Sequence, residues 1–145
     1  MTDVSRGQGI GSVVTGYYEK GQSILLQGSA TALRELGAIL VANEDTTLVH
    51  LYVPQAKAAE PYDGFLSVLQ VVESEGFVEV RQTGSTLAIT GSKENLAILS
   101  ESILFLANQP EQVSGIPNHL HIEYLPDHYY LASSSLPLVI SKVGQ

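Results

Sequence analysis

Apolar and polar residues alternate along this chain in two patterns, and the same succession of patterns occurs twice. Residues 23–27 read as an extended strand, and residues 29–43 carry leucine and isoleucine at the spacing of one helical face. The same order returns in residues 86–90 and 93–108. A repeated succession of this kind indicates two copies of one structural unit.

The remaining β-branched and apolar runs complete each copy, because they lie between residues typical of turns and loops. These further strands are expected at residues 10–18, 46–53 and 65–71 in the first copy, and at 77–82, 119–125 and 137–143 in the second. Leu66 to Val71 is aligned with Leu138 to Val143, and a loop at 110–117 exists only in the second copy.

The predicted fold class is therefore α+β, with two tandem β-β-α-β-β repeats, mainly antiparallel sheet, and both helices on one face. Residues 1–9 are expected to be a flexible N-terminus. Residues 10–75 form the first unit and 76–145 the second, in one compact pseudo-two-fold domain. Ser29 and Ser92 are predicted helix N-caps, and Gly21 and Gly84 are expected in hairpin turns.

The second helix is apolar on more than one side. Ile98, Leu104 and Phe105 lie off the main stripe of that helix. Such a helix is either deeply buried or presents a surface to another chain. Burial between the two units is the favoured interpretation, and a homodimer through this helix is the alternative.

The chain is acidic, with seven Lys and Arg against fifteen Asp and Glu and a net charge of −8. This charge disfavours nucleic acid and anionic membranes as partners and favours a basic protein. No Lys or Arg lies between Lys93 and Lys142. The sequence contains no cysteine, no visible secretory signal and no apolar run long enough to span a membrane, which together fit the cytoplasm.

One segment near the C-terminus combines residues that can carry chemistry. Alternation along a strand predicts that His119, His121 and Glu123 share one face, while Leu120, Ile122 and Tyr124 face the core. The polar face has no counterpart in the first copy. Four interpretations follow: a metal site, general acid–base catalysis, a protein recognition surface, or the solvated side of an edge strand.

A resemblance to a known family favours the recognition surface. The pattern His121-x-Glu123-Tyr124-x-Pro126-x-His128-x-Tyr130-Leu131, followed by Ser135-x-Pro137-Leu138-Val139, resembles the C-terminal signature of bacterial immunity proteins of family 32. The resemblance covers roughly residues 77–143. It implies a cytoplasmic bacterial protein that binds and neutralises a cognate toxin without catalysis.

We therefore expect a non-enzymatic protein-binding immunity protein with no cofactor and no metal, whose partner is a cognate toxin, possibly basic. The alternatives are a small metal-binding or metal-dependent enzyme using His119, His121 and Glu123, and a homodimeric structural domain. Aromatic and carboxylate side chains suit a protein interface. The residues predicted to contact the partner are His119, His121, Glu123, Asp127, His128, Tyr129 and Tyr130.

Overall fold

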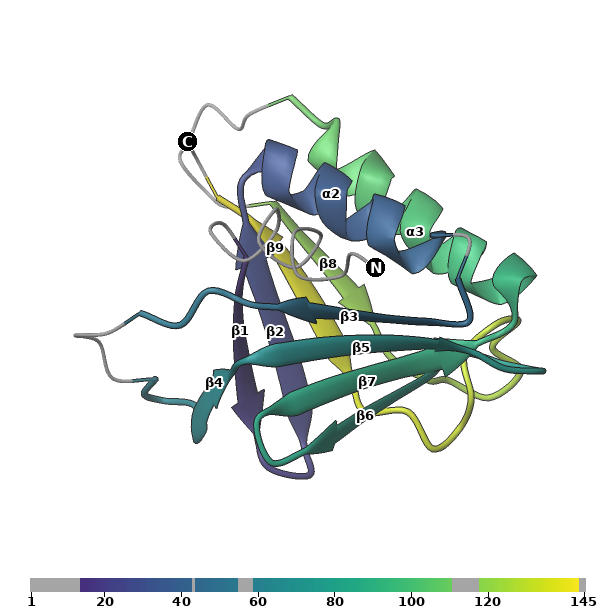
Figure 1. Cartoon of the computed structure of the whole chain (residues 1–145), viewed down its shortest axis with the longest axis horizontal. Helices are drawn as coiled ribbons and strands as arrows, with labels where there is room; N and C mark the ends of the chain where they lie inside the picture. Colours follow the sequence, from purple (N-terminus) through teal and green to yellow (C-terminus); the bar gives the residue numbers. More distant parts are fainter. Residues whose placement is uncertain (1–13, 43, 55–58, 111–117, 144–145) are drawn as a thin grey trace.

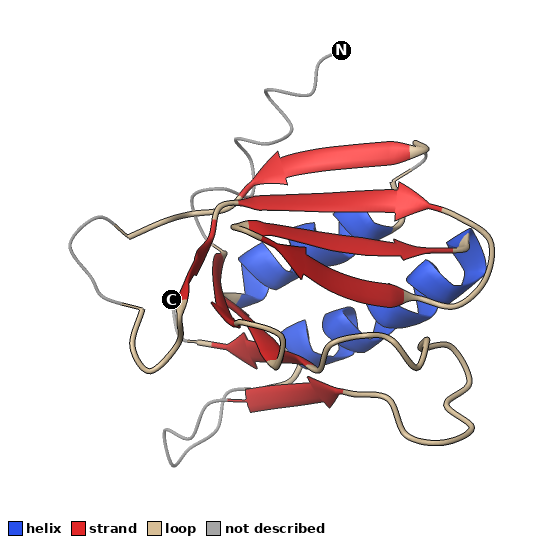
Figure 2. Cartoon of the chain, turned by 90° about the horizontal axis from the view of Figure 1, so that it is seen from below, coloured by secondary structure: helices blue, strands red, loops and turns tan. Residues whose placement is uncertain are grey.

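Two helices lie together on one side of two β-sheets, whose strands run in different directions (Figures 1 and 2). The computed structural model describes residues 14–42, 44–54, 59–110 and 118–143. The predicted flexible segment 1–9 and most of the predicted loop 110–117 lie outside the described residues. The predicted α+β class is confirmed.

The first sheet has five strands and is mainly antiparallel. In spatial order it contains β4 (Gly64–Leu66), β1 (Thr15–Glu19), β2 (Ser23–Gly28), β9 (Leu138–Lys142) and β8 (Asn118–Ile122). Only β2 and β9, at its centre, pair in parallel. Gly21 has a φ of 71° in the hairpin turn between β1 and β2, as its position in the sequence predicts.

The second sheet has four strands and repeats this arrangement. In spatial order it contains β3 (Thr46–His50), β5 (Val68–Glu73), β7 (Thr86–Gly91) and β6 (Glu79–Thr83). Its parallel pair is β5 with β7. Each sheet thus places an antiparallel hairpin from one half of the chain beside the last strand of the other half.

This exchange of strands changes the alignment of the two halves. Leu138 lies opposite Ile24, just as Leu69 lies opposite Leu87. Leu69 is therefore the positional counterpart of Leu138. The alignment of Leu66 with Leu138, which the sequence suggested, is wrong.

The single strand predicted at residues 65–71 is also wrong, because the chain changes sheet there. β4 ends at Leu66 and pairs with β1, whereas β5 begins at Val68 and pairs with β3 and β7. Between them, the backbone N–H of Ser67 donates to the carbonyl of Ser85 at 2.8 Å. The described residues consequently contain nine strands instead of the eight expected.

The helices α2 (Ala30–Leu40) and α3 (Lys93–Ala107) both begin at the predicted serine caps. Ser29 Oγ accepts from the N–H of Ala32, and Ser92 Oγ accepts from the N–H of Asn95, each at 3.2 Å. The helices pack closely because Gly37 leaves room for the side chain of Leu104. The hydroxyl of Ser100 donates to the carbonyl of Gly37 at 2.8 Å.

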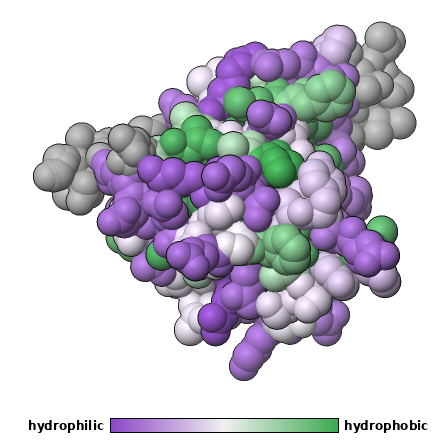
Figure 3. Space-filling view, turned by 90° about the vertical axis from the view of Figure 1, so that its right-hand side faces the viewer, coloured by the Kyte–Doolittle hydropathy of each residue, from purple (hydrophilic) through white to green (hydrophobic). Residues whose placement is uncertain are grey.

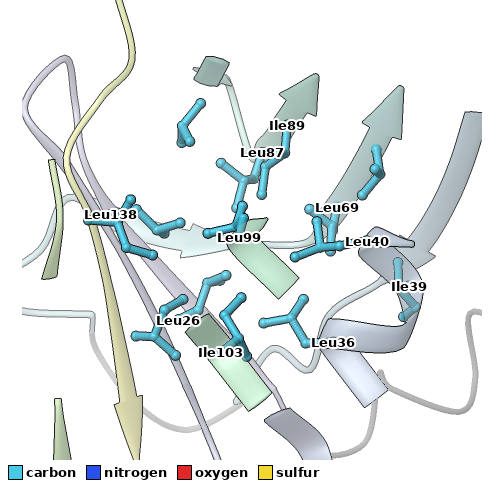
Figure 4. Packing of buried hydrophobic residues seen from close by; sticks show 14 of the residues in the cluster. Leu26, Leu36, Ile39, Leu40, Leu69, Leu87, Ile89, Leu99, Ile103 and Leu138 are labelled. Atoms are coloured by element: carbon cyan, nitrogen blue, oxygen red, sulfur yellow. The ribbon is translucent and has the colours of Figure 1, made fainter. Parts of the chain in front are cut away.

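The hydrophobic core lies between the helices and the inner faces of both sheets (Figure 4). Leu26 and Leu138 enter it from the five-stranded sheet, and Leu69 and Leu87 from the four-stranded sheet. Leu99 of α3 lies between these two groups in Figure 4 and is fully buried. Because one core serves strands from both halves, neither half has an interior of its own.

Candidate protein-binding site

The two histidines of β8 project from the outer face of the five-stranded sheet. His119 and His121 are exposed, and their ring centroids are 6.3 Å apart. Leu120 is half-buried and Ile122 is buried on the opposite face of the strand. The predicted alternation is therefore confirmed for residues 119–122.

The predicted alternation fails after Ile122, where β8 ends. Glu123 is exposed, and so is Tyr124, which the sequence pattern placed in the core. The chain instead enters a tight turn, in which the N–H of His128 donates to the carbonyl of Leu125 at 2.9 Å. Asp127 occupies the third position of this turn with a φ of 69°, the left-handed conformation of a type II turn.

His128 organises the chain that follows the turn. Its Nδ1 accepts from the backbone N–H of Leu131 at 3.1 Å and from that of Tyr130 at 3.3 Å. Its ring stacks on Tyr129 with centroids 5.7 Å apart and meets Tyr130 edge-on at 4.7 Å. His128 therefore supports the shape of the loop, and its Nδ1 is already engaged by the backbone.

Tyr130 is buried, with 5% of its surface exposed, so it does not belong to the accessible surface to which the sequence assigned it. Its burial raises the pKa of the phenol above its ordinary value, and the nearby Tyr129 adds to this rise. A hydrogen bond with the side chain of Ser102 partly opposes both effects. The neutral phenol is thus favoured in the folded state.

This raised pKa predicts an alkaline loss of stability. A neutral Tyr130 stabilises the fold below the ordinary tyrosine pKa of 10.0, and this contribution is lost as the pH rises through the higher pKa of the folded state. We expect Tyr130→Phe to make the free energy of unfolding fall less steeply above pH 10.0 in urea titrations. The exposed Tyr124→Phe is the control, and equal slopes for the two variants would contradict the prediction.

The segment after the turn is fixed to the outer edge of the four-stranded sheet. The N–H of Val78 donates to the carbonyl of Tyr130 at 2.8 Å, and that of Ala132 donates to the carbonyl of Val78 at 2.7 Å. Ser135 Oγ donates to the carbonyl of Val78 and accepts from the N–H of Val80, both at 3.0 Å. These bonds hold the loop against β6 and fix the position of Tyr129.

A groove of about 250 Å³ lies between α3, β8 and this loop. We call it the α3–loop groove, and its lining residues are Ile98, Glu101, Ser102, Phe105, Leu120 and Tyr129. Phe105 and Tyr129 expose 69% and 71% of their surface. Exposed aromatic rings beside a concave surface are typical of protein-binding sites.

Apolar side chains are exposed at several places on the molecule. On the side drawn in Figure 3, hydrophobic side chains gather in separate clusters among hydrophilic ones. The loop after β8 adds two further exposed apolar residues, Leu125 and Tyr124. The exposed apolar side chains of this region therefore come from one short stretch and from the adjoining face of α3.

The structure divides the predicted surface into two groups. His119 and His121 lie on one face of β8, while Leu120, on the other face, lines the groove with Tyr129. His128 and Tyr130 lie behind Tyr129 as its support. Glu123 and Asp127 are exposed in the loop that joins the two groups.

The structure shows how residues of the two enzymatic interpretations are arranged. Among the residues that the structure describes, no three His, Cys, Asp or Glu side chains come together as metal ligands. The hydroxyl of Ser134, near the candidate segment, donates to Glu79 Oε2 at 2.6 Å. That bond joins the loop to β6 and leaves Ser134 without a histidine base in the described contacts.

Sequence reasoning missed an aromatic cluster on the outer face of the five-stranded sheet. Tyr17 lies 5.3 Å from Tyr62 and 5.1 Å from Phe65, measured between ring centroids. The pairing of β1 with β4 brings these rings together. The alternation of residues 15–19 places Tyr17 on the outer face, but no sequence signal shows that Tyr62 and Phe65 would join it.

In the part of the chain that the structure describes, neither helix has the length and apolar character required to cross a membrane. The core of the fold accounts for the apolar residues of both helices that face inward.

Comparison with known proteins adds one match. No curated protein and no solved structure matches the chain. The groove residues and the loop after β8 all belong to the second half of the sequence. That half is where a family match occurs: the family model described as immunity protein 32 matches residues 86–143, in agreement with the resemblance that the C-terminal motif shows.

Proposed function

We propose that this chain neutralises a cognate bacterial toxin by binding it directly and without catalysis, through the α3–loop groove and the acidic loop beside it. A match to an immunity protein family suggests a toxin-neutralising role. The observation that carries the proposal is the overlap of two independent features. All residues that line the groove lie within the matched segment 86–143.

The properties of the groove support a protein partner. Phe105 and Tyr129 provide exposed aromatic area of the kind that dominates binding energy at interfaces. Tyr129 is held in place by its stacking on His128, so little conformational freedom is lost when a partner covers it. An ordered aromatic anchor of this type favours tight binding.

Charge supports a basic partner. Glu101 lines the groove, and the exposed Glu123 and Asp127 lie in the adjoining loop. After Lys93, at the start of α3, the next cation in the sequence is Lys142, which is buried and donates to the carbonyl of Gln109. These three carboxylates favour encounter with a basic protein. We infer that this encounter takes place in the cytoplasm, as the family resemblance implies.

The test of this function is co-expression with the toxin encoded by the open reading frame adjacent to the chain's gene. We expect survival of the host cells and a stoichiometric complex in size-exclusion chromatography. Death of the cells at matched expression, with no complex formed by the purified proteins, would overturn the proposal. Self-association through α3, the competing use of the surface, would instead give a chain whose apparent size depends on its own concentration.

Asp127 offers a test of the charge contribution that leaves the turn intact. Asparagine also tolerates a positive φ, so Asp127→Asn removes the charge and keeps the left-handed conformation. We expect the dissociation constant to rise about two- to fivefold at low salt for Asp127→Asn, and further for Asp127→Lys. Isothermal titration at two salt concentrations measures this, and equal affinities for all three proteins would exclude a role for this charge.

A further inference from the structure

β8 forms an edge of the five-stranded sheet. Within the described residues it pairs only with β9, in antiparallel register. The other long side of β8 carries no strand among those residues. An edge of this kind presents backbone donors and acceptors that another strand can pair with.

The hydrogen bonds of β9 show which residues of β8 face the open edge. The N–H of Ile24 donates to the carbonyl of Pro137, and the N–H of Val143 donates to the carbonyl of Gly28, both at 2.9 Å. Odd-numbered residues of β9 therefore direct their backbone groups toward β2, and even-numbered residues direct theirs toward β8.

The register of the β8–β9 pair completes this assignment. Ile140 of β9 lies opposite Leu120, so Leu120 uses its N–H and carbonyl to pair with β9. Backbone groups point to alternate sides along a strand. His119 and His121 consequently direct their N–H and carbonyl groups away from β9, toward the open edge.

The α3–loop groove lies along this edge. Leu120 belongs both to β8 and to the groove wall, opposite Phe105 and Tyr129. A strand added beside β8 would direct alternate side chains into the groove and past His119 and His121. An apolar side chain entering the groove would meet Phe105 and Tyr129.

The charged side chains near the open edge of β8 indicate what kind of strand could pair with it. Glu101 lines the groove, Glu123 directly follows β8, and Asp127 is exposed in the adjoining loop. A second copy of this chain would bring the same carboxylates to the same place, and their repulsion opposes pairing of two β8 strands. An extended basic segment fits both the backbone edge and the charge.

We propose that the toxin neutralised by this chain contributes an extended basic segment, which adds as a strand to β8 and inserts an apolar side chain into the α3–loop groove. The inference rests on the proposed function and specifies how that function is carried out. Main-chain hydrogen bonds at His119 and His121 would provide binding energy, and the groove would provide specificity.

The test separates the backbone of His121 from its side chain. His121→Pro removes an N–H that the β8–β9 pairing does not use, so the sheet can form, whereas His121→Ala keeps the N–H and removes only the imidazole. The probe is the toxin from the adjacent open reading frame. We expect the affinity to fall about tenfold or more for His121→Pro and to change by less than about threefold for His121→Ala.

The possible outcomes distinguish strand addition to β8 from the proposed toxin-neutralising function. A folded His121→Pro variant that binds like His121→Ala overturns strand addition and leaves the proposed function standing. Wild-type protein that does not bind the toxin overturns the function itself. Circular dichroism and the melting temperature establish whether the proline variant is folded.

Amide hydrogen exchange on the wild-type protein gives a second measurement that needs no variant. In the free protein the amide of Leu120 is expected to be protected, and those of His119 and His121 to exchange rapidly. Toxin binding should protect both histidine amides. Unchanged exchange in the complex overturns strand addition, and protection that appears with rising protein concentration alone identifies a second copy as the occupant instead.

Discussion

Replacement of Leu99 with alanine is expected to lower the free energy of unfolding by about 2–5 kcal/mol, a large loss for a single truncation. Leu99 is fully buried and projects from α3 toward Leu69 and Leu87 (Figure 4). Removing its side chain leaves a cavity at the junction of the helix layer with the sheets. Urea unfolding at neutral pH measures the loss.

Phe105→Ala is the matched control for this prediction, because it truncates another large apolar residue of the same helix. Phe105 is mostly exposed, so its loss should change the free energy of unfolding by no more than about 0.5 kcal/mol. A loss below about 1 kcal/mol for Leu99→Ala would show that this site is not closely packed.

Truncation of the two exposed aromatic residues in the groove is expected to weaken toxin binding strongly without affecting the fold. If the α3–loop groove holds the partner, Phe105→Ala and Tyr129→Ala should each raise the dissociation constant about ten- to a hundredfold. The reason is that each ring would be covered by the partner in a desolvated contact. Titration calorimetry measures the change.

A suitable control for these two variants is an exposed apolar residue next to the other helix, α2. Val41 follows α2 and is half exposed, and it lies outside the matched segment 86–143. Val41→Ala should leave the affinity unchanged. Equal affinities for wild type, Phe105→Ala and Tyr129→Ala would place the binding surface elsewhere, and the outer aromatic cluster around Tyr17 would be the next surface to test.

Local sequence signals predicted the elements of this fold well. The 3.6-residue periodicity and the serine caps located both helices, because caps and amphipathic faces depend on residues a few positions apart. The glycine turns at Gly21 and Gly84 have the positive φ expected. The outward histidines of β8 followed from alternation alone.

The candidate site was predictable only in part. Asp127 and Tyr129 are exposed, as the sequence suggested, but Tyr130 is buried behind its neighbour. Two adjacent aromatic residues in a loop carry no periodicity, so the sequence gives no basis for deciding which of them packs inward. Val78, far away in the sequence, forms hydrogen bonds with the backbone of Tyr130 and Ala132. These bonds fix the orientation in which Tyr130, and not Tyr129, packs inward.

By itself, the sequence determined the identity and order of the helices and most strands, their turns and caps, and the acidic character of the C-terminal segment. The tertiary structure alone decided that each sheet joins strands from both halves, that the chain changes sheet at Ser67, and that the groove forms beside the open edge of β8. The physical reason is the range of the interactions. Periodicity and capping act within a few residues, whereas strand exchange and the groove depend on contacts such as Ile24 with Leu138, which only burial in a shared core brings together.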